Sequence, residues 1–515
     1  MILEMHSHTS EHSVCSRIDA VSLVQAVHNM GFEGIVLTDH HYLWMPEEME
    51  DLRRRAGIPE YFIILAGQEV ATSDAGHVLV YGAERTLSEK TPLPAIRQEF
   101  PEAAIVWAHP YRNGHKPSPE GLTNPYRDAV EIFSSNHTVV ELNRGVRDWH
   151  RHKFAATGGT DAHSTANVGR YPTIFEHPVK SIGDLAAEIR AGRCRPLYKE
   201  ITRSRAPHIE VVELVIGLKG ANKVRENLVI KRYNRLDAWE RGNRTSHILK
   251  ELGRYSFHGG KFRVPRPLGS DAEELVLIEE GVRGRTLFER VLRADVEHAR
   301  FYLQLAAQWL ANLHNMKLQI TPPDEFMETE PHRLAHYVSN SDRIDPKHAR
   351  RISEITNHVL EAERVLYLHH PERMVQGHGD YHPKNLFIGQ DNPDDSESSY
   401  ISAVDFDDSY CMPPAFDVGT FITQFRSQFF HHRDVLKTVN EDFFLATYLQ
   451  YAEDAGDDFL AQVELFKARA SLSIIYFLIK IGLGDSENLW RILVEAEHSL
   501  TSLSIHESHA EFRAD

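Results

Sequence analysis

The stretch GHGDYHPKNLFIG occupies residues 377–389, and ISAVDFDDSY follows at 401–410. Asp380 and Asn385 stand five positions apart, and an apolar strand pattern leads from them to Asp405. Asn385 and Asp405 offer the hard oxygen ligands that suit Mg²⁺, and Asp380 can accept a hydroxyl proton. This stretch therefore combines a candidate proton acceptor with two candidate Mg²⁺ ligands.

The pattern HGDxxxxN, then a strand, then an aspartate at the strand end resembles the signature of the aminoglycoside/choline phosphotransferase family, a branch of the protein-kinase-like fold. The resemblance covers about residues 210–510. It implies an α+β bilobal domain that uses ATP and Mg²⁺, with Asp380 as catalytic base and with Asn385 and Asp405 as Mg²⁺ ligands. The expected domain spans 209–515, with an N-lobe at about 209–282 and a C-lobe at about 283–515.

The same resemblance assigns further roles. His378 would support the catalytic loop, and Asp417 would match the family's later structural aspartate. Lys231, in the middle of the strand pattern LVIKRY, would meet the ATP phosphates. Its expected helix partner is Glu240, with Glu251 as the second choice.

The nucleotide-binding segments are less regular. LIEEG at 277–281 resembles the adenine-contacting hinge, so we place Glu279 among the nucleotide-binding residues. GLKGANK at 217–223 has two glycines and departs from a full GxGxxG loop. This departure concerns the loop's contacts rather than the use of ATP.

A second group of polar residues lies near the N-terminus. His6 and His8 follow an apolar strand pattern two positions apart, so strand alternation places both imidazoles on one face. Asp161 and His163 repeat this spacing in TGGTDAHS. Histidine is the commonest metal ligand. The two pairs, with further ligand-type residues at successive strand ends, predict a metal cluster.

These motifs resemble the PHP (polymerase and histidinol phosphatase) family over about residues 1–195. The resemblance is carried by HSHTSEHS at 6–13, LTDHH at 37–41, GQE at 67–69, GH at 76–77, AHP at 108–110 and TDAHS at 160–164. It implies an α/β domain, a distorted (β/α)7 barrel, that holds two or three divalent metals at one rim. The implied metal ligands are His6, His8, His12, His40, Glu69, His77, His109, Asp161 and His163.

Nitrogen and oxygen ligands without thiolate suit Zn, Mn or Fe. Glu69 can bridge two metals and is counted among the catalytic residues. Clustered metals activate water and brace both oxygens of a phosphoryl displacement, which favours hydrolysis of a phosphate ester. Arg144, Arg147 and Arg170 are candidates to hold the substrate phosphate.

Alternating strand and helix patterns over the first 195 residues predict a parallel sheet or barrel. Asp19 is expected to cap a helix that ends near Gly31. The polar, basic segment 196–208 is the expected linker. The strands expected before the linker are 2–5, 35–38, 63–66, 78–81, 105–108, 130–133 and 139–142. After the linker we expect a hairpin of strands 211–216 and 227–233, a helix at 238–252 and a strand at 275–278.

Composition sets outer limits. The chain has 515 residues and a net charge of −17, so it lacks the broad basic field of a non-specific nucleic-acid binder, although a local basic groove stays possible. Three dispersed cysteines argue against disulfides and against a thiolate zinc site. No apolar run is long enough to span a bilayer, and the N-terminus lacks signal-peptide features. We expect a cytoplasmic protein without a membrane partner.

The leading hypothesis is a bifunctional enzyme in which a metal-dependent phosphoesterase is joined to an ATP- and Mg²⁺-dependent small-molecule kinase. Its partners would be ATP, a small hydroxyl acceptor and a small phosphate ester, for which a nucleotide is one candidate. Three alternatives remain open: a nuclease or nucleotide phosphatase as the N-terminal activity, an ATP-sensing kinase-like half that regulates the N-terminal phosphoesterase or nuclease, and a protein Ser/Thr kinase. The sequence names neither substrate and does not fix the oligomeric state.

Overall fold

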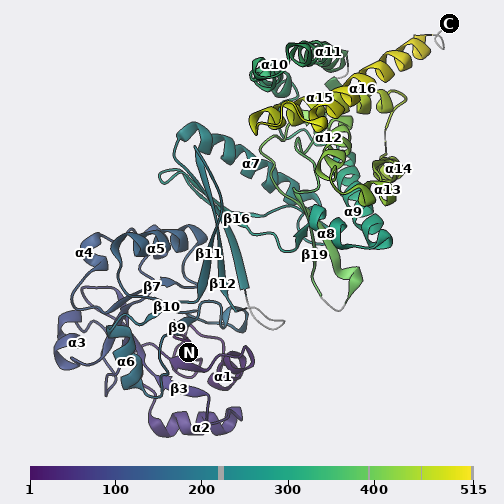
Figure 1. The fold of residues 1–515 in the computed structure, drawn as a ribbon. Coiled ribbons are helices and arrows are strands. Elements are labelled where there is room, and N and C mark those ends of the chain that lie inside the picture. Colours follow the sequence, from purple (N-terminus) through teal and green to yellow (C-terminus); the bar gives the residue numbers. More distant parts are fainter. Residues whose placement is uncertain (219–224, 370, 393–394, 454, 512–515) are drawn as a thin grey trace. The chain divides into compact units, whose positions relative to one another are not determined.

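The computed structural model describes residues 1–218, 225–369, 371–392, 395–453 and 455–511 (Figure 1). The chain divides by packing into two compact units, Met1–Trp239 with Leu268–Gly281, and Glu240–Pro267 with Val282–Asp515. The predicted linker 196–208 lies inside the first unit, where most of it forms strand β11 (Tyr198–Ala206). The predicted domain limits 1–195 and 209–515 therefore differ from this division and remain a sequence-based prediction.

The first unit opens with two five-stranded sheets. One has the order β10-β9-β1-β2-β3, and the other has the order β4-β5-β6-β7-β8. Their strands are β1 (Ile2–Glu4), β2 (Gly34–Leu37), β3 (Ile63–Ala66), β4 (Gln68–Ala71), β5 (His77–Tyr81), β6 (Ala104–Trp107), β7 (Ala129–Phe133), β8 (Ala156–Gly158), β9 (Thr173–Phe175) and β10 (Cys194–Pro196).

The expected parallel sheet or distorted (β/α)7 barrel is corrected by this topology. Both sheets are mixed: β1, β2 and β3 are parallel, whereas β9 runs antiparallel to β1 and β4 runs antiparallel to β5. Parallel neighbours need a crossover of a dozen or more residues, and only residues 72–76 separate β4 from β5. The described strands thus form two sheets instead of one closed barrel.

Six helices accompany these strands: α1 (Ala20–Asn29), α2 (Pro46–Ala56), α3 (Leu93–Glu99), α4 (Pro119–Leu122), α5 (Val139–His152) and α6 (Ile182–Arg190). Asp19 caps α1 as predicted, because its side chain accepts the Ser22 N–H at 2.9 Å.

The strand predicted at 139–142 is wrong, because those residues begin helix α5. Thr138 accepts the N–H of Glu141 at 3.3 Å, and Glu141 in turn accepts the N–H of Thr138 at 2.7 Å. This reciprocal capping box starts a helix and outweighs the strand preference of the paired valines.

A third sheet of the first unit has the order β11-β12-β13-β16-β15. Its further strands are β12 (Ile209–Gly217), β13 (Arg225–Tyr233), β15 (Pro267–Asp271) and β16 (Val276–Glu280). The predicted hairpin is confirmed, since β12 and β13 pair antiparallel along their whole length. Side chains of this sheet such as Leu214 and Ile230 belong to the same hydrophobic core as Ile132 of β7 and Val146 of α5. The third sheet is therefore packed onto the second one.

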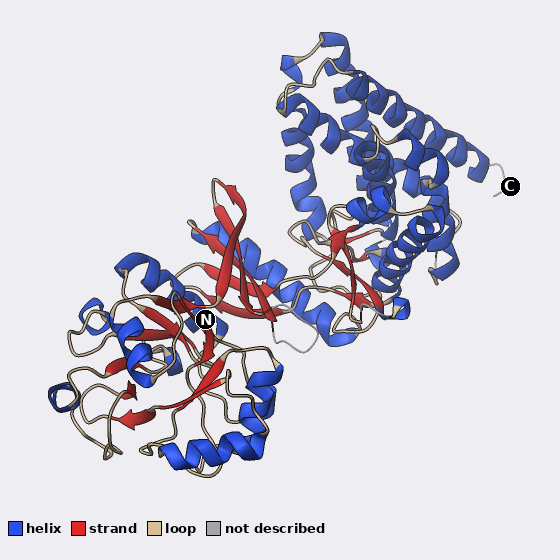
Figure 2. Cartoon of the chain, turned by 60° about the horizontal axis from the view of Figure 1, so that its bottom comes forward, coloured by secondary structure: helices blue, strands red, loops and turns tan. Residues whose placement is uncertain are grey.

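The second unit is mainly helical (Figure 2). Helix α7 (Leu236–Tyr255) leads into it from the first unit. Its helices are α8 (Leu287–Arg293), α9 (Val296–Asn315), α10 (Glu325–Val338), α11 (Pro346–His369), α12 (Pro414–Gln428), α13 (Arg433–Thr438), α14 (Glu441–Tyr451), α15 (Phe459–Lys480) and α16 (Glu487–Glu511). None of the described helices combines the length and the apolar character needed to cross a membrane.

Two small sheets complete this unit, β14-β20-β19-β17 and β18-β21. They consist of β14 (Phe262–Arg263), β17 (Arg285–Thr286), β18 (Val375–Gln376), β19 (Leu386–Gln390), β20 (Ser399–Ala403) and β21 (Cys411–Met412). The segment that carries Asp380 and Asn385 connects β18 to β19, and Asp405 follows β20. Short strands thus hold both ends of the predicted catalytic segment.

A charged cluster lies inside the helical unit. Arg469 of α15 donates to both oxygens of Glu330 of α10, at 2.8 and 3.0 Å, and both side chains are buried. Glu363 of α11 is buried beside them, with its Oε1 3.9 Å from Arg469 Nε. Burial and the neighbouring Glu330 raise the pKa of Glu363 well above its ordinary value.

Replacement of Arg469 removes the bidentate partner of the buried Glu330 carboxylate and leaves it with Arg333, whose Nη1 lies 3.5 Å from Glu330 Oε2. We expect Arg469→Met to lower the free energy of unfolding of this unit by about 3–5 kcal/mol, measured by chemical denaturation of the full chain. Arg350→Met is the control: among the described residues Arg350 pairs only with Glu354, both side chains are exposed, and the change should alter stability by less than about 1 kcal/mol. Equal effects of the two changes would refute the importance of the buried pair.

Candidate functional site

The predicted metal ligands of the first unit converge on Glu69. This carboxylate, in β4, is buried and lies next to five imidazoles from four segments of the chain. Its Oε2 is 3.2, 3.0 and 3.3 Å from nitrogens of His6, His8 and His40, and its Oε1 is 2.6 and 3.1 Å from nitrogens of His77 and His109. Asp161 Oδ1 adds a second carboxylate 3.0 Å from His8 Nε2.

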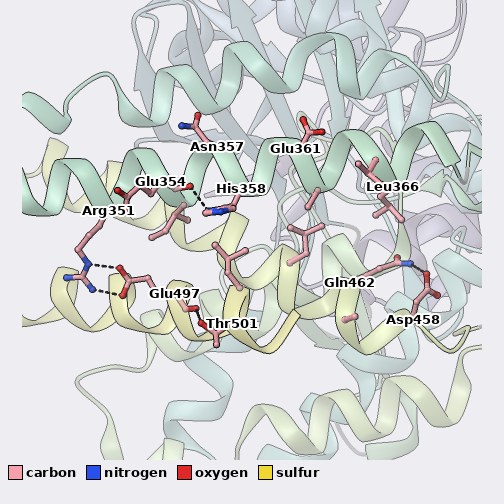
Figure 3. Close-up of a pocket in the computed structure, with 16 residues that line it drawn as sticks. Arg351, Glu354, Asn357, His358, Glu361, Leu366, Asp458, Gln462, Glu497 and Thr501 are labelled. Atoms are coloured by element: carbon pink, nitrogen blue, oxygen red, sulfur yellow. Dashed lines mark hydrogen bonds and ion pairs between the residues drawn. The ribbon is translucent and has the colours of Figure 1, made fainter. Parts of the chain in front are cut away.

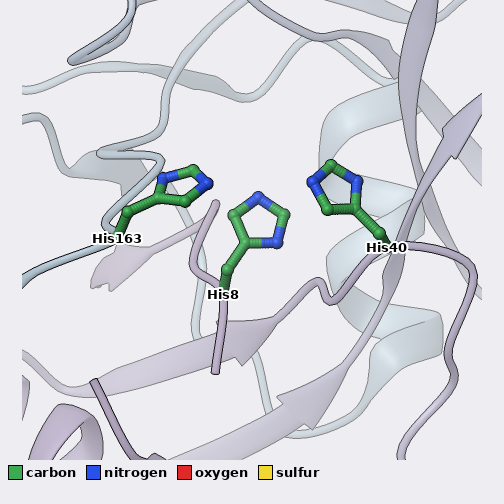
Figure 4. A group of neighbouring side chains, drawn as sticks. All are labelled: His8, His40 and His163. Carbon is green, nitrogen blue, oxygen red and sulfur yellow. The ribbon is translucent and has the colours of Figure 1, made fainter. Parts of the chain in front are cut away.

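These atoms fall into three groups whose ligand atoms lie within 4.8 Å of one another. His8, His40 and His163 form one group, and their three rings face a common centre in Figure 4. The second group consists of His6, His8, Glu69 and Asp161, and the third consists of Glu69, His77 and His109. Glu69 is thus shared by the second and third groups, and His8 is shared by the first and second.

His12 lies apart from these groups. Its ring stacks on Tyr42 with centroids 3.5 Å apart, and it meets Trp44 edge-on at 4.8 Å. Among the described residues it contributes to none of the three ligand groups. The structure thus brings together the other eight predicted ligands but not His12.

Glu131 is a site residue that the sequence reasoning missed. It is fully buried in β7, where its Oε1 accepts His6 Nδ1–H at 2.9 Å and its Oε2 accepts the His109 N–H at 2.8 Å. A proton held on Nδ1 directs the other ring nitrogen of His6 towards Glu69. The only sequence signal was one charged residue within the apolar strand AVEIF.

The charges of this cluster stabilise one another. Burial opposes ionisation of Glu69, but His6, His109 and His77 outweigh it and lower the pKa of Glu69 well below its ordinary value. Burial also disfavours a charged His8, yet Asp161 and Glu69 raise its pKa to about 9. At His40 burial prevails and lowers the pKa to about 4.

The donor set fits divalent transition metals. It consists of imidazole nitrogens and carboxylate oxygens, the combination that suits Zn, Mn or Fe. Two of the donors also adopt backbone conformations that cost energy, since φ is 53° at Asp161 and 31° at His109. Such strained positions cluster at functional sites, so the backbone supports the same assignment as the donor chemistry.

A cavity of about 390 Å³ opens beside the cluster. Cys15, Arg112, Ser135, Asn136 and Asn167 line it together with six of the ligand residues. The three arginines predicted to hold a phosphate are elsewhere and are paired with carboxylates. Arg144 bonds Asp271 and Glu274, Arg147 bonds Glu274, and Arg170 bonds Glu226. Arg112 is the only arginine or lysine that lines the described part of this cavity.

The predicted kinase-type residues of the second unit form a braced loop. Asn385 Nδ2–H donates to Asp380 Oδ2 and to its backbone oxygen, both at 3.0 Å. Burial opposes ionisation of Asp380, but His382, 3.4 Å away, together with His378 and Asn385, lowers its pKa. Asp380 is therefore a carboxylate near neutral pH and can accept a proton.

Asp417 holds the start of this loop through hydrogen bonds to its backbone. Its carboxylate accepts the N–H groups of His378 and Gly379 at 2.7 and 2.8 Å, and His314 Nε2–H at 3.2 Å. Gly379 has φ 86°, and a Cβ there would lie 1.8 Å from the backbone oxygen of Asp408. The loop before Asp380 therefore requires glycine at position 379.

The structure describes part of the segments that the sequence predicts to bind nucleotide. Lys231 Nζ lies 3.1 Å from Glu279 Oε1, so the lysine is paired with a residue of the predicted hinge. The pairing of Lys231 with Glu240 stays a prediction. Asp405 has φ 69°, a strained conformation of the kind found at ligand sites. Of the loop GLKGANK, residues 219–223 lie outside the described part of the chain.

A larger cavity, of about 920 Å³, lies between α11, α15 and α16 (Figure 3). Arg351 and Glu497 close one end with hydrogen bonds of 2.6 and 2.8 Å, and Gln462 bonds Asp458 at the other. None of the predicted catalytic or ligand residues lines it, so size alone does not mark the chemistry.

Comparison with protein families agrees with the loop geometry. Residues 220–461 match the model of the phosphotransferase enzyme family, and this segment contains Asp380, Asn385 and Asp405. Residues 220–461 are a phosphotransferase-family domain. A match to this family implies ATP and Mg²⁺ as cofactors. Residues 142–194 match a PHP-associated model, which supports the resemblance of the N-terminal part over that segment only.

Solved structures similar to the chain include several phosphotransferases. An ethanolamine kinase of Plasmodium vivax is 16% identical, with TM-score 0.37, and the match covers 60% of this chain and 83% of that one. A choline kinase of Cryptosporidium parvum is 13% identical, with TM-score 0.40 and coverage of 60% and 91%. A macrolide 2'-phosphotransferase of Brachybacterium faecium is also 13% identical, with TM-score 0.35 and coverage of 58% and 92%. No curated protein sequence matches the chain significantly.

The sharing of ligands predicts unequal losses of metal. Glu69 serves two of the ligand groups, whereas His163 serves one. We expect Glu69→Gln to remove two metal equivalents and His163→Ala to remove one, measured by elemental analysis of the full chain after loading with Zn²⁺ or Mn²⁺. Glu99→Gln changes an exposed partner of Arg85 and should lose none. Equal metal content in all three variants would contradict the assignment.

Proposed function

We propose that the chain is a bifunctional enzyme, in which the phosphotransferase domain phosphorylates a small-molecule hydroxyl and the N-terminal metal cluster hydrolyses a phosphate ester. The observation that carries the kinase half is the geometry of the loop within the matched family segment: Asn385 bonds Asp380, and Asp417 holds the backbone of His378 and Gly379 just before it. The support for the hydrolase half is the set of three ligand groups that share Glu69.

In the kinase reaction, Asp380 orients the acceptor hydroxyl and accepts its proton as the oxygen bonds to the γ-phosphorus of ATP and ADP departs. Asn385 holds Asp380 in place, and Asn385 and Asp405 would hold Mg²⁺, which neutralises phosphate charge when bound. Lys231 contributes a positive charge for the phosphates, and Glu279 fixes its ammonium group. Glu240 and Glu279 complete the proposed nucleotide-binding residues.

In the hydrolase reaction, Glu131 and Glu69 hold the metal-ligating side chains in position. Glu131 fixes the tautomer of His6, and Glu69 joins two ligand groups into one unit. Divalent metals, when bound, would lower the pKa of a water ligand and polarise phosphoryl oxygens. Arg112 lies at the cavity wall and has no carboxylate partner among the described residues. It can therefore bind a substrate phosphate without first breaking an ion pair.

Removal of the proposed base tests the kinase. We expect Asp380→Asn to lower acceptor-dependent ADP formation from Mg-ATP by about 10²–10⁴-fold, measured with a coupled assay on a pool of polar hydroxylated metabolites. Asp391→Asn is the control, since Asp391 is an exposed partner of Arg263. Turnover that survives Asp380→Asn would reject the assigned base. Mg-ATP binding without acceptor-dependent turnover in the wild type would favour a sensor.

Removal of the shared carboxylate tests the hydrolase. With Mn²⁺ or Zn²⁺ present, we expect hydrolysis of 4-nitrophenyl phosphate or its bis-ester to fall by at least about tenfold in Glu69→Gln. Glu99→Gln should keep the wild-type rate, and Asp380→Asn should stay within a few-fold of it. If Asp380→Asn abolished hydrolysis in folded protein, two separate active sites would be ruled out.

A further inference from the structure

A small cationic cavity lies at the junction of β17, α8 and α9 in the second unit. Its volume is about 220 Å³, and Arg285, Arg290, Arg293 and Tyr302 contribute to its wall. Arg290 and Arg293 stand three positions apart on α8 and therefore share a face of that helix. Arg285 comes from the adjoining strand β17.

The carboxylates of this cavity already have other partners. Glu289 accepts the Thr286 N–H at 3.2 Å in the capping box of α8. Asp295 caps α9 through the His298 N–H at 2.9 Å and bonds the His298 ring at 2.8 Å. Neither carboxylate is ion-paired with one of the arginines in the described structure.

The arginines keep unused donors. Across the described residues none of the three has an ion pair with a carboxylate. Arg290 makes one weak bond, from Nη2 to the backbone oxygen of Ile388 at 3.4 Å, and its Nε is buried without a hydrogen-bond partner. Three guanidinium groups face two carboxylates at this cavity, and none of the described arginines is ion-paired with either, so an excess of positive charge and of free donors is left for an external anion.

We propose that this cavity binds a phosphate group. Arginine presents a planar fork of donors that matches phosphate oxygens, and three such forks can share one dianion. The cavity is smaller than the roughly 300–1,000 Å³ of pockets that enclose a whole ligand. It therefore takes a compact group, either inorganic phosphate or the phosphate of a small metabolite whose remainder stays outside.

The site is joined to the catalytic loop. The Phe288 N–H of α8 donates to the backbone oxygen of Pro383 at 3.1 Å, and Pro383 lies between Asp380 and Asn385. Arg285 and Thr286 in β17 also pair with Ile388 and Phe387 in β19, which follows Asn385 directly. An anion bound to α8 and β17 thus rests on the same backbone that positions the proposed base. The binding itself does not depend on the proposed kinase activity.

Binding to the full chain can be measured by calorimetry. A chelator keeps the protein free of divalent metals, so that phosphate cannot bind through the N-terminal cluster. The probes are inorganic phosphate, glycerol 2-phosphate and, as the uncharged control, glycerol. We expect saturable binding of at least one phosphate probe at millimolar concentration or below and none of glycerol. Tighter binding of glycerol 2-phosphate identifies an esterified ligand, and the reverse order identifies the free ion.

Arg290→Gln with Arg293→Gln should weaken phosphate binding at least tenfold. The matched control is Arg350→Gln with Arg364→Gln, which removes the same charge from exposed positions on α11 and should leave binding unchanged. Equal weakening in both double variants, or no binding to the wild type, overturns the proposal. If the α8 variant does not fold, Arg285→Gln and the phosphate-induced rise in Tm provide the same test from outside the helix.

Discussion

A carboxylate that is buried away from water is stable only when donors surround it. Glu69 meets this requirement with five imidazoles, and Asp417 meets it with two backbone N–H groups and one imidazole. Each carboxylate thereby fixes segments that are distant in sequence at a single point. In the first unit those segments are strand ends that carry metal-type ligands. In the second unit they are the loop of Asp380 and the end of α9, so one electrostatic requirement organises both candidate sites.

Much of this arrangement could be predicted from sequence because the relevant patterns are local. The His6/His8 pair follows from strand alternation, and the hairpin β12–β13 follows from two apolar runs around a turn. Contacts over long distances could not be predicted in this way. No pattern marks Glu131 as the partner of His6. Nothing near Arg144 in the sequence shows that Asp271 and Glu274 will neutralise it.

The errors also have physical causes. Residues 139–142 begin helix α5 instead of forming the predicted strand, because the capping box of Thr138 and Glu141 outweighs the strand preference of the two valines. The parallel barrel was expected because strands and helices alternate, but the short connection between β4 and β5 forces an antiparallel pair. His12 has the right chemistry for a ligand, yet stacking on Tyr42 places its ring elsewhere.

The third sheet shares its hydrophobic core with β7 and α5, so the two halves of the chain could not readily be encoded by separate genes. A gene split at residues 196–208 would yield two products. One would expose the apolar surface of β7 and α5, and the other would expose the apolar face of the third sheet. Large exposed apolar patches promote association and aggregation. Selection against such products would keep the two halves in one reading frame whatever each half does, so their fusion by itself is no evidence that they act on related molecules.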